Sequence, residues 1–157
     1  VAPVLCEGKG RVSVGEGTVF GFMEDADFWT TYEFLNPRNV DSKISIGKNC
    51  QICNRFTAVS EGEGIEIGDN VLVGSSVTVL DSDFHEIDPE KRVGGNPKTG
   101  KVVIGDNAWI GDRVMILKGT AIGKNSVVAA GSVVSGEFPA NVVIGGVPAR
   151  VIREIGG

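Results

Sequence analysis

Aliphatic residues recur at every sixth position in the C-terminal half of the chain. They stand at Ile104, Ile110, Ile116, Ile122, Val128 and Val134. Four positions after most of them comes a second set of mainly smaller side chains, at Ala108, Val114, Thr120, Ser126 and Ser132. A period of six fits neither the 3.6-residue repeat of a helix nor the simple alternation of a hairpin strand. The spacing predicts a short strand followed by a turn, repeated along the chain.

Three such units close a triangular coil of about 18 residues, and stacked coils form a parallel β-helix with aliphatic ladders along its axis. Further hexads in the N-terminal half extend the stack. They begin at Val14, Phe20, Ile46, Ile52, Ala58, Ile67, Val73 and Val79. The chain is rich in glycine, with 23 residues, and we expect these at the tight corners of the coils. The predicted fold class is therefore all-β.

The period breaks twice, between Phe20 and Ile46 and between Val79 and Ile104. The first break predicts an irregular segment over about 22–43, in which Phe28, Trp29 and Tyr32 either bind a sugar face or pack onto the solenoid. The second predicts an excursion over about 81–101 that holds the only histidine of the chain. Loops that interrupt a regular scaffold are where function tends to lie, so this excursion is the candidate active-site loop.

The period fades near the C-terminus, where we expect residues of about 146–157 to cap the open end of the solenoid with a short strand or helix. The whole chain of 157 residues, with 41% hydrophobic side chains, suits a single domain over 1–157.

The charge and the cysteines narrow the classes of partner. A net charge of −5 argues against binding to nucleic acid or to an anionic membrane surface. No apolar run is long enough to span a bilayer, and residues 1–10 lack the pattern of a signal peptide, so we expect a cytoplasmic protein. Cys50 and Cys53 read C-x-x-C without a second ligand pair, which favours small-residue positions in the repeat over a zinc or redox site.

Four segments resemble the hexapeptide-repeat acetyltransferases, which fold as left-handed parallel β-helices. They read D-S-D-F-H-E over 81–86, I-G-D-N-A-W-I-G-D over 104–112, A-A-G-S-V-V over 129–134 and G-V-P-A-R-V-I-R-E over 146–154. The branch they resemble most comprises the galactoside, maltose and surface-polysaccharide O-acetyltransferases. The likeness runs from Ile65 to Glu154 and is looser before that. The long helical N-terminus of the galactoside and maltose enzymes has no counterpart, and the first 45 residues look more like the polysaccharide-tailoring members.

The resemblance implies a homotrimer with active sites between adjacent subunits, and acetyl-CoA as the co-substrate lying along the groove. It implies that His85 is the catalytic residue and that Asn54 contacts the acceptor. The coenzyme contacts it implies are Asp112, Ala130, Ser135, Arg150 and Arg153. One departure concerns the coenzyme: the family commonly has Thr-Lys where this chain has Ser135-Gly136, so Arg150, Arg153 and Lys118 must supply the positive charge.

Transfer of an acetyl group to a hydroxyl or amine requires a base for the acceptor's proton, and histidine suits this role near neutral pH. If residues 81–85 are extended, the side chains of Asp81, Asp83 and His85 point the same way, so either carboxylate can orient the imidazole or hold an acceptor hydroxyl. Asp83 can equally be a turn residue that bonds its own backbone. Trp109 follows an inward position and points outward, toward the cleft or a subunit contact. Paired guanidinium groups at Arg150 and Arg153 suit the coenzyme phosphates.

The sequence leaves two alternatives to a sugar O-acetyltransferase of bacterial surface-polysaccharide synthesis and excludes a third. A nucleotide-linked amino sugar as acceptor makes the reaction an N-acetylation. A purely structural β-helix requires regular coils, which the two breaks disfavour. A zinc enzyme like the γ-class carbonic anhydrases needs three histidines, and this chain has one, so we expect no metal. Direct attack is favoured over an acyl-cysteine relay, because no cysteine is near His85 in the sequence.

Overall fold

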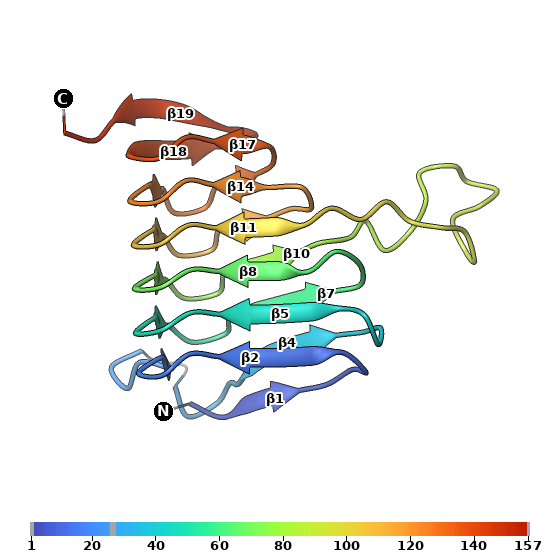
Figure 1. Ribbon diagram of the computed structural model, residues 1–157, viewed down its shortest axis with the longest axis horizontal. Coiled ribbons are helices and arrows are strands. Elements are labelled where there is room, and N and C mark those ends of the chain that lie inside the picture. Colours follow the sequence, from blue (N-terminus) through green and yellow to red (C-terminus); the bar gives the residue numbers. More distant parts are fainter. Residues whose placement is uncertain (1, 26–27, 157) are drawn as a thin grey trace.

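The protein forms a single stack of coils that rises from the N-terminus to the C-terminus, with one long loop leaving its side (Figure 1). The structure is a computed structural model that describes residues 2–25 and 28–156. Over these residues the chain forms strands β1 to β19 and no helix. No helix that could cross a bilayer is therefore found in the described part of the chain.

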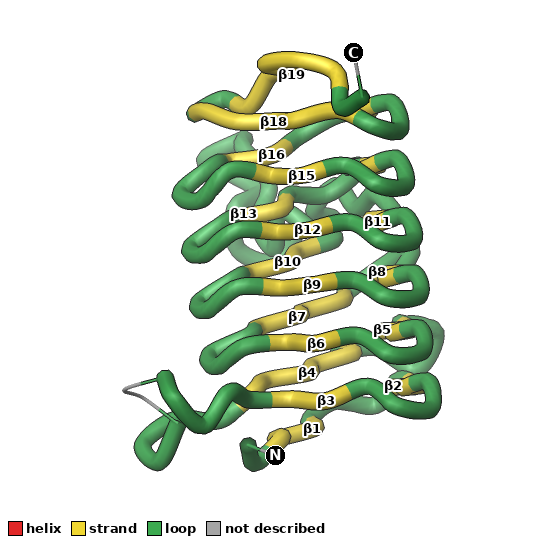
Figure 2. Tube along the Cα trace, turned by 90° about the vertical axis from the view of Figure 1, so that its left-hand side faces the viewer, coloured by secondary structure: helices red, strands yellow, loops and turns green. Residues whose placement is uncertain are grey.

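Three parallel sheets form the sides of the stack (Figure 2). Sheet A consists of β1 (Val4–Cys6), β4 (Glu33–Pro37), β7 (Thr57–Ser60), β10 (Thr78–Leu80), β13 (Met115–Ile116) and β16 (Val133–Val134). Sheet B consists of β2 (Arg11–Val14), β5 (Lys43–Ile46), β8 (Ile65–Ile67), β11 (Val102–Ile104), β14 (Ala121–Ile122) and β17 (Glu137–Phe138). Sheet C consists of β3 (Val19–Phe20), β6 (Gln51–Ile52), β9 (Leu72–Val73), β12 (Trp109–Ile110), β15 (Val127–Val128), β18 (Val142–Gly146) and β19 (Ala149–Glu154).

The chain passes from sheet A to B to C and then begins the next coil, so the stack has three corners, which we name A–B, B–C and C–A. Equivalent residues of successive coils stand in register, as Ile46, Ile67, Ile104 and Ile122 do in sheet B. These side chains point inward and are buried, as are the other predicted aliphatics from Ile104 to Val134. The all-β hexapeptide β-helix that the six-residue period predicted is confirmed.

Glycines lie at the corners as expected, but at several corners the reason is the close approach of the next coil and not the backbone conformation. At Gly47, a Cβ atom would lie 2.4 Å from Asp69 Oδ1 and 2.5 Å from the carbonyl carbon of Gly68 in the next coil. Glycine is needed there because neighbouring coils approach too closely for a side chain. The left-handed backbone of these B–C corners falls two residues later, mostly on asparagine, which tolerates a positive φ. Asn49, Asn70, Asn107 and Asn125 have φ between 54° and 60°.

The segment expected to be irregular over 22–43 contains a regular strand. Strand β4 pairs in parallel with β7, with Leu35 beside Ala58, and Leu35 is buried in the core. The break between Phe20 and Ile46 thus consists of two insertions, one on each side of a strand. The number of residues between Phe20 and Ile46 does not by itself reveal the strand between them. Phe28 is buried and meets the exposed Trp29 edge to face at 4.9 Å. Residues 26–27 of this segment lie outside the described residues.

The C-terminal residues close the stack with a strand. Strand β19 turns back and pairs antiparallel with β18, which covers the last parallel edge of sheet C. An antiparallel partner stops further parallel addition, as an end cap of a solenoid must. Of the two forms of cap that the sequence left open, a short strand or a short helix, this chain has the strand.

One carboxyl group is buried inside the stack near the C–A corner. Glu33, the first residue of β4, is fully buried, and its Oε2 accepts a hydrogen bond from the Phe56 N–H at 2.6 Å. Its other oxygen has no hydrogen-bond partner among the described residues. Burial, partly opposed by the Phe56 hydrogen bond, raises the pKa of Glu33 from 4.5 to about 7, with Asp25 adding to the rise.

We expect Glu33 to make the protein less stable as the pH rises from about 4.5 to 7. In this window the unfolded chain releases the Glu33 proton and the folded chain keeps it. The free energy of unfolding is therefore lower by about 3 kcal/mol at pH 7 than at pH values below 4.5. Glu33→Gln keeps the acceptor for Phe56 and removes the charge. The free energy of unfolding, measured with urea from pH 4 to 8, should therefore decline less with pH in the variant than in the native chain. The variant should be the more stable of the two at pH 8. Equal slopes for the two proteins would contradict this assignment.

Candidate active site

The long excursion leaves the stack at the A–B corner, between β10 and β11 (Figure 1). Its root is fixed by Asp81, which is fully buried. The Asp81 carboxylate accepts hydrogen bonds from the Ser60 hydroxyl at 2.7 Å, from the Glu61 N–H at 2.7 Å and from the Gly64 N–H at 2.8 Å. These bonds tie the excursion to the corner of the preceding coil, so its first residues start from a defined position.

His85 lies on this excursion with an exposed side chain. Its Nδ1 is 2.9 Å from the carbonyl oxygen of Arg92. A carbonyl oxygen only accepts, so in the neutral ring Nδ1 carries the proton and donates it to Arg92. The lone pair is then on Nε2, the nitrogen left to take a proton from an acceptor. The contact thus selects the tautomer that a general base needs.

The His85 side chain lies at the edge of a hollow of about 300 Å³. It is lined by Asp83, His85, Glu86, Ile87, Asp88, Asn96 and Lys98. Asp83 pairs with Lys118, with Oδ2 at 3.3 Å from Nζ, and both side chains are partly exposed. The hollow therefore combines a base, carboxylates, an amide and a cation, which suits a polar acceptor with several hydroxyl groups.

The expectation that Asp81, Asp83 and His85 share one face is wrong. Phe84 has a φ of 61°, in the left-handed region, so the run from 81 to 85 is not an extended strand. Asp81 is buried and bonds the preceding coil, whereas Asp83 and His85 are exposed. Asp81 consequently anchors the excursion and does not orient the imidazole.

The residues predicted to bind the coenzyme lie in three places. Asp112 and Ala130 are exposed at the C–A corner, where the Asp112 Oδ1 accepts a hydrogen bond from the Ser75 N–H at 2.9 Å. Ser135 is exposed at the A–B corner, after β16. Arg150 and Arg153 are exposed on the terminal strand β19. The structure leaves all five accessible.

Trp109 points outward from sheet C, with 54% of its surface exposed between the buried Ala108 and Ile110. The outward direction that alternation predicted is therefore correct. The column of outward residues containing it is largely apolar. It runs Val19, Gln51, Leu72, Trp109, Val127 and Val143.

Asn54 has a structural role in this chain. It is fully buried, its Oδ1 accepts the Phe22 N–H at 2.8 Å, and its Nδ2 donates to the Phe22 carbonyl at 3.3 Å. Both polar groups of the amide therefore hold the start of the 22–32 loop, and neither is exposed at the surface where a substrate could bind. The half-buried neighbour Cys53 faces a shallow hollow of about 380 Å³, and burial raises the pKa of its thiol.

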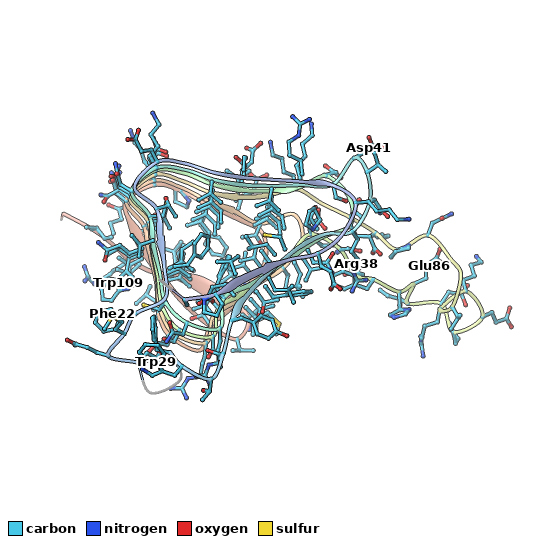
Figure 3. The ribbon with its side chains drawn as sticks, turned by 90° about the horizontal axis from the view of Figure 1, so that it is seen from below. Phe22, Trp29, Arg38, Asp41, Glu86 and Trp109 are labelled. Carbon is cyan, nitrogen blue, oxygen red and sulfur yellow. The ribbon has the colours of Figure 1, made fainter. Side chains whose placement is uncertain are left out.

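One chain does not bring the predicted residues into one cluster. His85 and Asp83 belong to the A–B corner, whereas Asp112 and Ala130 belong to the C–A corner. The view along the stack places the excursion with Glu86 far to one side and Trp109 at the other (Figure 3). Sequence reasoning also missed Ser60 and Glu61, which hold the root of the excursion, because only the stacking of coils brings them beside residues 81 and 82.

Two family models match the repeats. Residues 101–136 match the bacterial transferase hexapeptide (six repeats), and residues 43–80 match the hexapeptide repeat of succinyl-transferase. The two matched ranges lie on either side of the excursion and together span strands β5 to β16 of the stack.

Several known proteins of similar sequence are acetyltransferases by name. The galactoside O-acetyltransferase of Escherichia coli is 45% identical over 114 residues, which cover 73% of this chain and 55% of that protein. A putative lipopolysaccharide biosynthesis O-acetyl transferase of the same organism is 36% identical over 71% of this chain and 60% of its own length. The chain thus spans less than two thirds of these curated relatives.

A solved galactoside acetyltransferase in complex with coenzyme A has a similar fold. The two chains are 34% identical and superpose with a TM-score of 0.58 over 91% of this chain and 64% of the other.

We expect Asn54→Ala to lower stability and leave ligand binding intact. Removing a buried amide that satisfies two backbone groups should cost about 2 kcal/mol of unfolding free energy. The matched control, Cys53→Ala, changes a half-buried neighbour and should cost less than about 1 kcal/mol. Chemical unfolding measures both. A stability for Asn54→Ala equal to that of the native chain would show that the amide does not hold the loop.

Proposed function

The chain belongs to the hexapeptide-repeat acetyltransferase family, in its galactoside and maltose O-acetyltransferase branch, and on this basis we propose that it transfers an acetyl group from acetyl-CoA to a sugar hydroxyl. The observation that carries the proposal is the His85 imidazole, held by Arg92 with Nε2 free beside a polar hollow. The names of the relatives support an acetyl group as the group transferred, coenzyme A as its carrier and a galactoside as the acceptor.

In the proposed reaction, His85 Nε2 takes the proton from the acceptor hydroxyl as its oxygen attacks the thioester carbonyl carbon. The tetrahedral intermediate collapses, the carbon–sulfur bond breaks, and the imidazolium returns the proton to the coenzyme sulfur. The products are the O-acetyl sugar and free CoA. Asp83 accepts a hydrogen bond from a second acceptor hydroxyl, and Trp109 of a neighbouring copy supplies an apolar surface for the sugar face.

The coenzyme is bound by Asp112, Ala130, Ser135, Arg150 and Arg153 in this proposal. Both arginines are exposed on β19 and offer planar donors that match phosphate oxygens. Lys118 is paired with Asp83 at the acceptor hollow, so its charge is partly neutralised there. The two arginines therefore carry most of the attraction for the phosphates, in place of the lysine that Gly136 replaces.

The complete site is built between two copies of the chain in a homotrimer. The separation of His85 and Asp83 from Asp112 and Ala130 over two corners supports this arrangement. The outward faces of the sheets add further support. Sheet C presents the apolar column around Trp109, whereas the outward column of sheet B carries Ser13, Ser45, Glu66, Val103, Ala121 and Glu137. Apolar faces are the ones that subunits bury.

A sugar unit of a bacterial surface polysaccharide is the acceptor we propose. The support is the name of one relative, the lipopolysaccharide biosynthesis O-acetyl transferase of Escherichia coli. The first step in testing this acceptor class is a comparison of sugars with nucleotide-linked amino sugars. Transfer to the amine alone would replace O-acetylation with N-acetylation.

We expect His85→Ala to reduce turnover by about a hundredfold or more, the lower range for a lost general base. Release of free CoA from acetyl-CoA is measured with a panel of sugars and nucleotide amino sugars. The matched control is Val93→Ala, which changes a side chain 90% exposed on the same excursion and should keep native turnover. The absence of both CoA release and acetyl-CoA binding in the native chain would favour a structural solenoid.

Mixing two inactive variants tests the shared site. We expect chains with His85→Ala and chains with Asp112→Ala, produced together, to form trimers in which some interfaces combine an intact His85 with an intact Asp112. Random assembly gives such interfaces in about a quarter of cases. Turnover near that fraction of the native value is expected, against almost none for either variant alone. No recovery in verified mixed trimers would place the whole site within one chain.

A further inference from the structure

Phe84, the residue directly before His85, has an unusual backbone. Its φ of 61° lies in the left-handed region, which residues with a branched or bulky side chain seldom adopt. Such a conformation persists only when the surroundings hold it. Because Phe84 and His85 share a peptide bond, whatever holds Phe84 also sets the direction in which the imidazole leaves the chain.

The backbone of Phe84 is held from one side by a short hydrogen-bond chain. Its N–H donates to the Ser82 hydroxyl oxygen at 2.9 Å, and that hydroxyl donates to Glu61 Oε2 at 2.8 Å. Ser82 is buried, and Glu61 belongs to the A–B corner of the preceding coil. The backbone of the excursion is thus connected to the scaffold immediately before His85.

The ring of Phe84 is held from the other side by Arg38. The guanidinium carbon lies 4.7 Å from the ring centroid, in the geometry of a cation–π contact. Arg38 Nη1 is also 3.6 Å from Glu61 Oε1, so Glu61 connects the two restraints. The backbone N–H of Arg38 donates to the Ser60 carbonyl at 2.8 Å, which fixes the arginine directly after β4.

We propose that Arg38 is a positioning residue, which acts through the Phe84 ring to hold the His85 imidazole in the orientation its reaction requires. The inference rests on the proposed function of His85 as the base. Residues of three successive A–B corners, 38, 61 and 82, meet at this point, so the scaffold itself sets the direction of the loop. The group acts on the imidazole only through the backbone and ring of Phe84.

A purely stabilising role fits the exposure of the pair less well. The Arg38 side chain is 46% exposed and that of Glu61 is 23% exposed, and exposed ion pairs contribute little to the stability of a fold. Loss of Arg38 should therefore leave the stack folded. An effect on catalysis can then be separated from unfolding.

The variants to compare are Arg38→Gln, Phe84→Leu and their double variant, with Phe84→Tyr as the conservative replacement that keeps the ring. The matched control is Arg11→Gln, an exposed arginine on sheet B. We expect kcat to fall by about tenfold in each single variant. This is more than the loss of one cation–π contact would cause and less than a fully displaced base would cause. The KM for acetyl-CoA should stay within about twofold of the native value in the single variants. The double variant should have a kcat no lower than that of the single variants, because both changes remove the same contact. Phe84→Tyr and Arg11→Gln should keep native kcat.

A second measurement does not depend on activity. His85 is the only histidine, so the ring nitrogen signals of untagged, ¹⁵N-labelled protein report its tautomer directly. The native chain should show the proton on Nδ1, and Arg38→Gln and Phe84→Leu should shift the population toward the other tautomer as the Arg92 contact loosens.

The outcomes separate the inference from the proposed function. Native kcat in both single variants, or a lower kcat with an unchanged tautomer, would overturn the positioning role while leaving the acetyltransferase proposal intact. Native kcat in His85→Ala would instead remove the base itself, and the positioning role with it. A decline in kcat together with a shift of tautomer supports the inference.

Discussion

The close approach of neighbouring coils is the constraint on which the rest of this protein depends. A Cβ atom at Gly74 would lie 2.3 Å from Asp112 Oδ1 in the next coil, so side chains are excluded where the coils touch. The same spacing lets the parallel strands form unbroken ladders and brings Ile46, Ile67 and Ile104 into one inward column. An extra residue within a strand would move every following side chain to the wrong face. Insertions are therefore accepted at the corners.

This rule explains where chemistry can be placed. The excursion that carries His85 leaves from one corner, and the loop held by Asn54 leaves from another. Each is fastened by polar side chains of adjacent coils, as Asp81 fastens the first through three backbone N–H groups. A repetitive scaffold thus supports loops whose starting points are well defined and whose outer residues are exposed, as Trp29 and Ile87 are. Because the two corners lie on opposite sides of one chain, we propose that a second copy supplies the other half of the site.

Much of the fold could be predicted because the repeat is local. Every predicted aliphatic from Ile104 to Val134 is buried, and so is the second set from Ala108 to Ser132. Strand β4 was missed, because the two insertions around it hide its period. Asp81 was misplaced because the alternation of a strand was assumed through Phe84, whose left-handed backbone ends that alternation. Asn54 was assigned to the acceptor by motif, but its neighbour Cys53 is the residue that faces outward.

The sequence by itself determined the six-residue period, the burial of its aliphatics, and the excursion with its single histidine, since each depends on residues close together in the chain. Only the tertiary structure decided which nitrogen of His85 is free, because the conformation of the excursion places the Arg92 carbonyl oxygen beside Nδ1. It also decided that Arg38, Glu61 and Ser82 meet beside Phe84. The contacts among Arg38, Glu61 and Ser82 join residues of different coils, and the pitch of the stack, which no local pattern encodes, sets which of them become neighbours.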